Sequence, residues 1–180
     1  MSKYLIVNAD DFGYAQGVNQ GIIAAHEAGV VLSTSLMVDM PSAGEATTLA
    51  KAHPNLGVGL HFTVTDQQGP LVDVSDLAMI EQEVCRQYLC CCDLLGHPLT
   101  HIDSHHHVHL RKELKPFFTE WAGERRLPLR GAGGAHYNGG FYGQWYDEEW
   151  TPHSAPEFIG IVVINFTALP SIMEQSHAAA

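Results

Sequence analysis

The feature that most constrains the fold of this chain is a regular alternation of short apolar runs with segments of helical periodicity. The first run, residues 4–7, is continuously apolar, which is typical of a strand covered on both faces in a parallel sheet. Further strands are predicted at residues 30–38, 56–63, shortly before 101, 127–130 and 158–166, and helices at residues 18–28, 41–52, 75–95 and 113–124. The alternation predicts an α/β protein with a parallel sheet, either open or closed into a barrel.

Length and composition narrow the class of protein. A chain of 180 residues suits a single domain, residues 1–180, and neither a repeat nor a linker divides it. The formal net charge of -11 argues against nucleic acid as a partner, because such binders need a basic face. No apolar run approaches the roughly 20 residues that span a bilayer, and the first run is too short for a signal peptide. The expectation is a cytoplasmic protein without a membrane partner.

The four cysteines do not suggest a disulfide framework. Cys85 and the triplet at residues 90–92 contain no CxxC pair, and they fall within the predicted helix at residues 75–95. The helical spacing places Cys91 on the apolar side, so it is predicted to be a small buried core residue.

Residues 101–109 hold five of the twelve histidines together with one carboxylate. If this segment is extended, alternate side chains share a face. The side chains that would then face one way are His101, Asp103, His105, His107 and His109. Imidazole is the commonest protein ligand for transition metals, so the segment predicts a metal site. The alternative interpretation is a solvated histidine-rich tract.

Polar residues also follow other predicted strands. Asp10 and Asp11 come after the first strand, His61 lies near the end of the third, and His105 lies just past the fourth. In parallel α/β folds the carboxyl ends of the strands meet, so these side chains are expected to converge. Taken singly, His61 reads as a core histidine and the two aspartates as a turn or helix cap. Together they predict one site.

One carboxylate with two imidazoles suits Zn²⁺, Mg²⁺, Mn²⁺ or Fe²⁺ and leaves positions open for water and substrate. The adjacent Asp10 and Asp11 would point to different sides of an extended backbone. One of them can hold the metal while the other faces the reacting water as a base. A metal-bound water has a lowered pKa and can attack a carbonyl that the ion polarises.

With these residues in hand, the sequence resembles the YdjC-like carbohydrate deacetylases, which include the chitooligosaccharide deacetylases. The matching stretches are LIVNADDFG at residues 5–13, STSLMV at 33–38, VGLHF at 58–62 and THIDSHHHVH at 100–109. Their order and spacing match over about the first 130 residues. The resemblance implies an irregular (β/α) barrel with fewer than eight strands and a shortened C-terminal part. It also implies a divalent metal, Mg²⁺ or Zn²⁺, and removal of acetyl groups from N-acetylglucosamine-containing sugars.

The resemblance also implies roles for individual residues. Asp11, His61 and His105 look like the metal ligands, and Asp10 looks like the catalytic base. The residues expected beside the substrate are His107 and Arg130. Asp103 is expected to orient a ligand imidazole, as carboxylates behind metal-bound histidines do.

The C-terminal third departs from the family pattern. Family members continue further and carry a His-Pro-Gly segment, whereas residues 173–178 match only its beginning, with Ala178 in place of the proline. His177 is the candidate general acid, and a frayed terminus is the alternative interpretation. An unfinished barrel would give a reason for association into a homo-oligomer.

Three hypotheses therefore stay open. The first is a metal-dependent deacetylase, and the second is a metal- or sugar-binding remnant of the same fold without turnover. The third is an iron oxygenase with two histidines and one carboxylate, whose usual scaffold is an all-β jelly roll.

Overall fold

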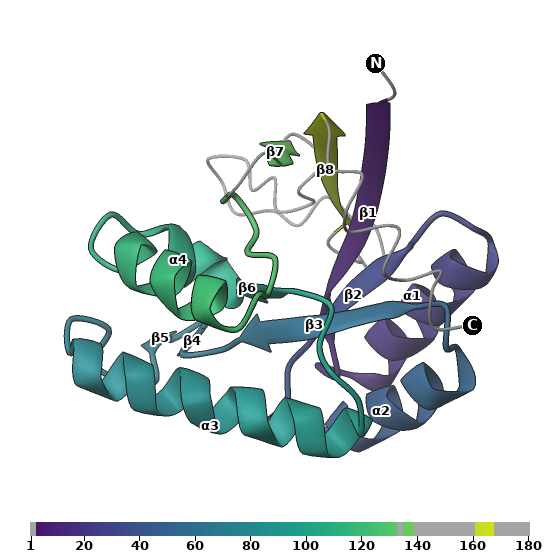
Figure 1. The fold of residues 1–180 in the computed structure, drawn as a ribbon. Coiled ribbons are helices and arrows are strands. Elements are labelled where there is room, and N and C mark those ends of the chain that lie inside the picture. Colours follow the sequence, from purple (N-terminus) through teal and green to yellow (C-terminus); the bar gives the residue numbers. More distant parts are fainter. Residues whose placement is uncertain (1–2, 133–134, 139–160, 168–180) are drawn as a thin grey trace, which may run out of the picture.

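The computed structural model of the protein describes residues 3–132, 135–138 and 161–167 (Figure 1). The strands are β1 (Lys3–Phe12), β2 (Ser33–Leu36), β3 (Gly57–Phe62), β4 (Thr65–Asp66), β5 (Gly69–Pro70), β6 (Ile102–Ser104), β7 (Ala135–Asn138) and β8 (Ile161–Thr167). The helices are α1 (Gln16–Glu27), α2 (Ala43–Ala52), α3 (Leu77–Leu95) and α4 (Lys115–Glu124), and η1 (His105–Leu110) is a 3₁₀ segment.

The main sheet has the order β6-β3-β2-β1-β8-β7, and its first four strands are parallel. These four strands curl into a half-barrel, with α1, α2 and α3 along one side of it (Figure 1). Parallel neighbours need crossover connections, and the helices between β1, β2, β3 and β6 supply them. The predicted α/β class is confirmed, with a half-barrel of parallel strands.

The last strand differs from the prediction of an all-parallel sheet. β8 pairs antiparallel with β1, with Lys3 opposite Thr167 and Ala9 opposite Ile161, and β7 pairs antiparallel with β8. An antiparallel neighbour needs no crossover helix. Of the residues between Arg130 and Ile161 that the structure describes, residues 135–138 form β7.

The parallel strands separate apolar and polar side chains onto two faces. In β3, Val58, Leu60 and Phe62 are buried in the apolar core, while Gly57, Gly59 and His61 alternate with them. Register extends this pattern to the neighbouring strands, because Leu60 lies opposite Ile102 and His61 lies opposite Asp103. One face of the half-barrel is therefore apolar and packs against the helices, and the other carries polar groups.

The ends of helix α3 are set by capping residues in the sequence. The carboxylate of Asp76 caps α3 by accepting hydrogen bonds from the N–H groups of Ala78 and Met79, and Gly96 ends the helix in the left-handed conformation. Cys91 is fully buried in the core, as its spacing predicted.

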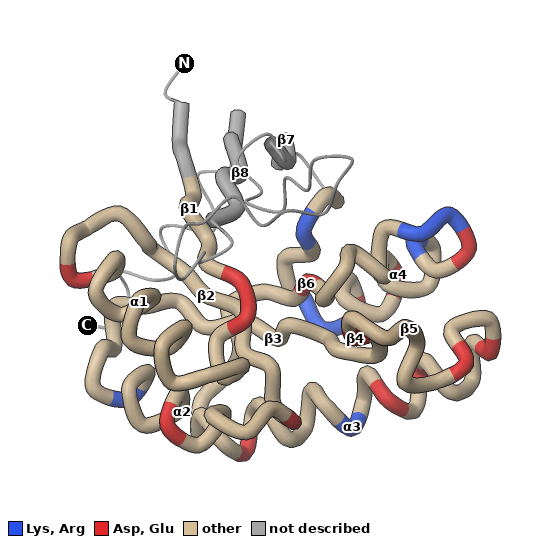
Figure 2. The backbone as a smooth tube through the Cα atoms, turned by 180° about the vertical axis from the view of Figure 1, so that it is seen from behind, with Lys and Arg blue, Asp and Glu red and all other residues tan. Residues whose placement is uncertain are grey.

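Acidic residues are spread over helices and loops of the described chain (Figure 2). Among the described residues, no helix combines the length and apolar character that a membrane crossing requires.

Two further segments differ from expectation. Residues 101–109 are not extended throughout, because β6 ends at Ser104 and a 3₁₀ segment follows, in which His106 and His107 both have φ of 52°. The five polar side chains therefore do not share one face. Residues 65–74, for which the sequence predicts neither a strand nor a helix, contain the small β4–β5 hairpin.

The C-terminal predictions are described only in part. The short strand expected at residues 127–130 is a single parallel bridge between Ile102 and Leu129. Most of residues 131–156, for which the sequence predicts neither a strand nor a helix, lie outside the described residues, as does His177.

Candidate functional site

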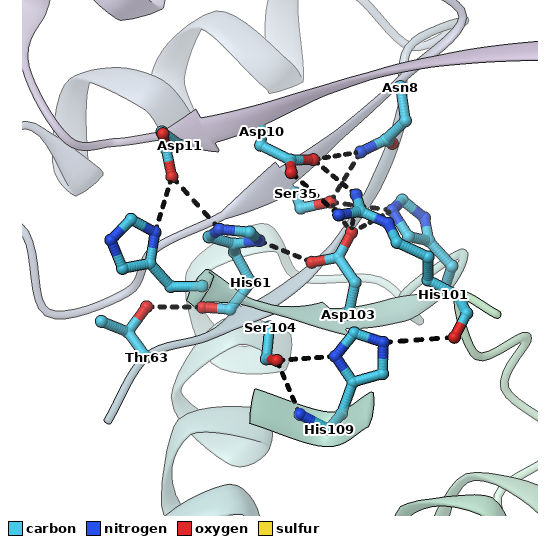
Figure 3. Close-up of polar contacts among 12 residues, drawn as sticks. Asn8, Asp10, Asp11, Ser35, His61, Thr63, His101, Asp103, Ser104 and His109 are labelled. Carbon is cyan, nitrogen blue, oxygen red and sulfur yellow. Dashed lines mark hydrogen bonds and ion pairs between the residues drawn. The ribbon is translucent and has the colours of Figure 1, made fainter. Parts of the chain in front are cut away.

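Three side chains from separate strand ends bring metal-ligating atoms together. Asp11 lies in β1, His61 in β3 and His105 directly after β6. One ligand atom from each lies within 4.8 Å of the other two. Asp11 Oδ1 is 3.1 Å from His61 Nε2 and 3.1 Å from His105 Nδ1 (Figure 3). Two donors bound about 2.1 Å from one ion lie roughly 3.0–3.4 Å apart, so this spacing suits a shared cation.

An irregularity in β1 separates the directions of Asp10 and Asp11. The pairing of β1 with β2 shifts register between Ala9 and Phe12, and Asp11 has φ of 65°. The left-handed region is uncommon for a residue with a side chain, although aspartate tolerates it better than most. Such strained positions are often found at functional sites. Here the distortion directs the Asp11 carboxylate towards His61 and His105.

His61 lies between two carboxylates. Its Nδ1 is 2.6 Å from Asp103 Oδ1, while its Nε2 faces Asp11. Burial opposes a charge on the ring, but the nearby carboxylates of Asp103, Asp11 and Asp10 outweigh it and raise the pKa of His61 to about 10. Without a cation the ring is an imidazolium that donates to both sides. When a cation replaces the Nε2 proton, Asp103 continues to orient the ring through Nδ1.

The electrostatics of Asp11 match this arrangement. Burial would raise the pKa of its carboxyl, but hydrogen bonds from His105 and His61, together with their charge, hold the pKa well below its usual range. Asp11 is therefore an anion, which is the form that binds a cation.

Behind this trio lies a buried ion network. Arg130 is 4% exposed and donates through Nη1 to Asp10 Oδ2 at 2.8 Å, while its Nη2 donates to both Asp10 Oδ1 and Asp103 Oδ2. Burial works against ionisation of Asp103, but Arg130 and His61 outweigh it and hold the pKa of that carboxyl well below its usual range. Asn8 Nδ2 also donates to Asp10 Oδ1, at 2.9 Å.

A hydrogen-bonded chain extends from Asp103 through β2. Ser35 Oγ donates its single proton to Asp103 Oδ2 at 2.6 Å, so its contact with His101 Nε2 at 3.0 Å requires that nitrogen to donate. His101 Nδ1 is then free to accept from Thr100 Oγ1 at 2.8 Å. Sequence reasoning missed Ser35, because serine in a strand is ordinary and its partners are distant in the chain.

His109 belongs to a different environment. Its Nε2 is 3.2 Å from the carbonyl oxygen of Arg130 and its Nδ1 is 2.6 Å from Ser104 Oγ. A carbonyl only accepts, so Nε2 carries the proton and Nδ1 accepts from the hydroxyl. Burial lowers the pKa of His109 to about 3. It is a neutral framework residue that fixes the backbone of Arg130.

The two residues expected beside the substrate lie in different surroundings. Arg130 is buried against Asp10 and Asp103. His107 is partly buried in η1, and burial together with the positive charge of Arg130 lowers its pKa. Next to it, His106 is exposed, stacks on His105 with ring centroids 3.9 Å apart, and contacts Thr65 Oγ1 through Nδ1 at 3.0 Å.

Gln87 of α3 is a second residue that sequence reasoning missed. Its side-chain amide accepts from the N–H of Thr63 at 2.9 Å and donates to the carbonyl of Thr63 at 2.7 Å. It thereby fixes the chain two residues beyond His61. Its position on the buried side of a helix was the available signal, because a buried amide needs partners.

The described site carries an excess of negative charge. Three carboxylates, Asp10, Asp11 and Asp103, are opposed by one guanidinium when the histidines are neutral. A divalent cation at Asp11, His61 and His105 would balance this charge. The donor set, one carboxylate and two imidazoles, also leaves coordination positions for water and a substrate oxygen.

Comparisons with known proteins agree on one family. A family model described as YdjC-like protein matches residues 4–163. A carbohydrate deacetylase of Geobacillus stearothermophilus is 45% identical over 149 residues, which cover 72% of this chain and 60% of the relative. A chitooligosaccharide deacetylase of Proteus mirabilis is 41% identical over 151 residues, covering 72% of this chain and 59% of the relative.

A solved structure adds a match in three dimensions. A protein of Enterococcus faecalis described as a cellobiose-phosphate cleavage protein superposes with a TM-score of 0.61 at 34% identity, covering 70% of this chain and 57% of that one. The matched part of this chain thus corresponds to about 60% of the length of its curated relatives.

Proposed function

Because the chain belongs to the YdjC-like family, we propose that it is a metal-dependent hydrolase that removes acetyl groups from N-acetylglucosamine-containing oligosaccharides. The relatives named carbohydrate deacetylase and chitooligosaccharide deacetylase support this choice of reaction and substrate. The observation that carries the proposal is the convergence of Asp11, His61 and His105, one ligand atom from each lying within 4.8 Å of the others.

In this proposal Asp11, His61 and His105 hold a divalent cation, Mg²⁺ or Zn²⁺. When bound, the cation lowers the pKa of a water ligand and polarises the acetamide carbonyl. Asp103 keeps the Nδ1 proton of His61 in place, so that Nε2 presents its lone pair to the cation. Two imidazoles favour zinc, while the family resemblance includes magnesium.

Asp10 is the proposed base that takes the proton of the attacking water. Its carboxylate is held by Arg130 and Asn8, and one of its oxygens lies within 4.8 Å of a ring nitrogen of His61. A carboxylate has about four acceptor positions, so three N–H donors leave room for a proton from water.

His107 and Arg130 form the proposed substrate side of the site. His107 is partly buried and is proposed to contact the sugar. Arg130 is bonded to Asp10 and Asp103, so its proposed effect on the substrate passes through those carboxylates. The amine that leaves must be protonated, and the candidate acid His177 lies outside the described residues.

The test is acetate release from diacetylchitobiose by the full chain, with each divalent metal supplied in turn. We expect activity with metal, loss of activity with a chelator, and loss in Asp10→Asn and His61→Ala. His97→Ala and Asp73→Asn are matched controls, because both residues are exposed and neither belongs to a group of ligating atoms. Full activity in both Asp10→Asn and His61→Ala would contradict the assignment. Metal binding without acetate release would instead support the non-catalytic hypothesis.

A further inference from the structure

A second group of ligating atoms lies beside the first. One atom each from Asp10, His61 and Asp103 lies within 4.8 Å of the other two, and all three residues are buried. His61 belongs to both groups, since Nε2 faces Asp11 and Nδ1 faces Asp103. The carboxylates of Asp10 and Asp103 give this second group the charge of another cation site, while Nδ1 of His61 keeps its proton towards Asp103.

The second position already contains a positive charge. Arg130 Nη2 donates to Asp10 Oδ1 and to Asp103 Oδ2, and Nη1 donates to Asp10 Oδ2 at 2.8 Å. We infer that the Arg130 guanidinium acts as a resident second cation, which limits the chain to one divalent ion, at Asp11, His61 and His105. The inference rests on the proposed metal site and adds a stoichiometry and a cause for it.

Charge and geometry both support this role. A guanidinium stays charged at any working pH and presents its N–H donors in a fixed plane, so it can satisfy carboxylates permanently. By contrast, a divalent ion can dissociate. The side chains of Asp10, Asp103 and Arg130 are each 3% exposed or less, so two carboxylates left there without a cation would be strongly destabilising.

The backbone of Arg130 is fixed independently of these carboxylates. Its N–H donates to the carbonyl of Ile102 at 3.2 Å, and its own carbonyl accepts from His109 Nε2 at 3.2 Å. These bonds anchor the residue on β6 and on η1, so the side chain extends from a fixed point. Removing only the guanidinium therefore leaves the backbone at residue 130 anchored.

The experiment counts Mn²⁺ ions bound by the full chain, by electron paramagnetic resonance of free and bound ion after equilibrium dialysis. Mn²⁺ suits carboxylate and imidazole donors and avoids the cysteines of α3. We expect one ion per wild-type chain and two per Arg130→Ala chain, with the spin coupling of neighbouring ions in the variant. Arg130→Lys, which keeps a cation, is expected to bind one. Added guanidinium ion should return Arg130→Ala to one.

Arg125→Ala is the matched control. The guanidinium of Arg125 lies over the Trp121 ring, 4.0 Å from its centroid, and contacts neither Asp10 nor Asp103 in the described interactions. Its loss should therefore leave one ion bound. If Arg130→Ala does not fold, Arg130→Gln removes the charge and keeps more of the volume. A wild-type chain with two ions, or folded Arg130→Ala and Arg130→Gln with one, would overturn the inference without bearing on whether the wild-type chain releases acetate. A wild-type chain that binds no ion contradicts the proposed metal site itself.

Discussion

His61 and His109 are both almost completely buried, at 2% and 0% exposure, yet their surroundings act on them in opposite directions. Burial lowers the pKa of each ring, because a charged imidazolium loses its hydration. Around His109 the partners are a hydroxyl and a carbonyl, and the pKa falls to about 3. Around His61 the partners are the carboxylates of Asp103 and Asp11, and the pKa rises to about 10.

The difference shows that burial does not separate a candidate ligand histidine from a framework one. The charge of the neighbouring groups distinguishes the two histidines. The carboxylates around His61 stabilise any positive charge at Nε2, whether a proton or a metal ion. The environment of His109 stabilises a neutral ring with a fixed tautomer. Variants of these histidines and of their partners test this contrast.

Removing each ring should have opposite consequences for metal binding. We expect His61→Ala to abolish binding of Mn²⁺ or Zn²⁺, because it deletes a ligand from a set of three. His109→Ala should keep the affinity within a few-fold but lower the free energy of unfolding by about 2–5 kcal/mol, through a cavity and unpaired polar groups. Calorimetric titration and urea unfolding measure the two effects. Equal loss of metal affinity in both variants would remove the distinction between them.

The stability of the metal-free chain should depend on pH through both rings. The folded pKa of His61 lies above its ordinary 6.5, so its contribution is complete below about pH 6.5 and is lost as the pH rises towards 10. The folded pKa of His109 lies below 6.5, so its contribution is present above about pH 6.5 and is lost as the pH falls towards 3. Each limb has a slope of about 1.4 kcal/mol per pH unit.

Urea unfolding with a chelator present, at intervals from pH 4 to pH 9, measures this dependence. His61→Gln should flatten the alkaline limb, and His109→Gln should flatten the acidic one. The wild-type chain should lose its alkaline limb when metal is added, because the cation replaces the His61 proton. An alkaline limb that persists in His61→Gln would assign it to another group.

Asp103→Asn removes the negative charge behind His61 while keeping the shape of the side chain. We expect the pKa of His61 to fall and the metal affinity to drop by about 10–100-fold, as is usual when the partner of a metal-bound histidine is lost. Calorimetric titration measures it, with the exposed Asp73→Asn as control. Unchanged affinity in Asp103→Asn would mean that the carboxylate serves the ion network with Arg130 and not the imidazole.

Part of this site could be predicted from the sequence. The apolar runs mark the strands, and parallel strands end at one edge, which predicts that the Asp10–Asp11 pair, His61 and His105 converge. The choice of Asp11 over Asp10 as the ligand came from the family resemblance. The helical spacing of α3 likewise predicted the burial of Cys91. Both predictions follow from hydrophobic periodicity, which can be recognised within a short stretch of the sequence.

Other parts depend on contacts between distant residues. Nothing local distinguishes the left-handed Asp11, or the 3₁₀ turn after Ser104 that breaks the expected alternation of the histidines. β8 pairs antiparallel with the edge of β1 that β2 does not occupy, and this pairing depends on residues far apart in the chain. The partners of Asp10 were also hidden, because Arg130 is 120 residues away in the chain. Tertiary hydrogen bonds override local pattern at each of these positions.

His101 is intermediate between His61 and His109, and a substitution at Gly59 offers a way to move its ring. Burial lowers the pKa of His101, as for His109, but its Nε2 donates to Ser35 and so connects to Asp103 and His61. A Cβ at Gly59 would lie 2.5–2.6 Å from three atoms of the His101 ring, which is too close, so the ring must shift. At Gly57, two residues earlier in the same strand, a Cβ would have contacts of 3.4–3.5 Å.

We therefore expect Gly59→Ala to lower the free energy of unfolding by about 1 kcal/mol, at the low end for overpacking, because the His101 side chain is partly exposed and can yield. Gly57→Ala should be close to neutral. Metal affinity should fall by less than tenfold in Gly59→Ala, since Asp103 keeps its bonds to His61 and Arg130 when Ser35 loses His101. Urea unfolding and calorimetric titration of Gly59→Ala, His101→Ala and the double variant form a cycle. If the substitution at Gly59 acts through the His101 ring, the double variant should be no less stable than His101→Ala. Additive losses of stability would instead place the effect of Gly59 in the strand itself. His101 would then be a framework residue like His109.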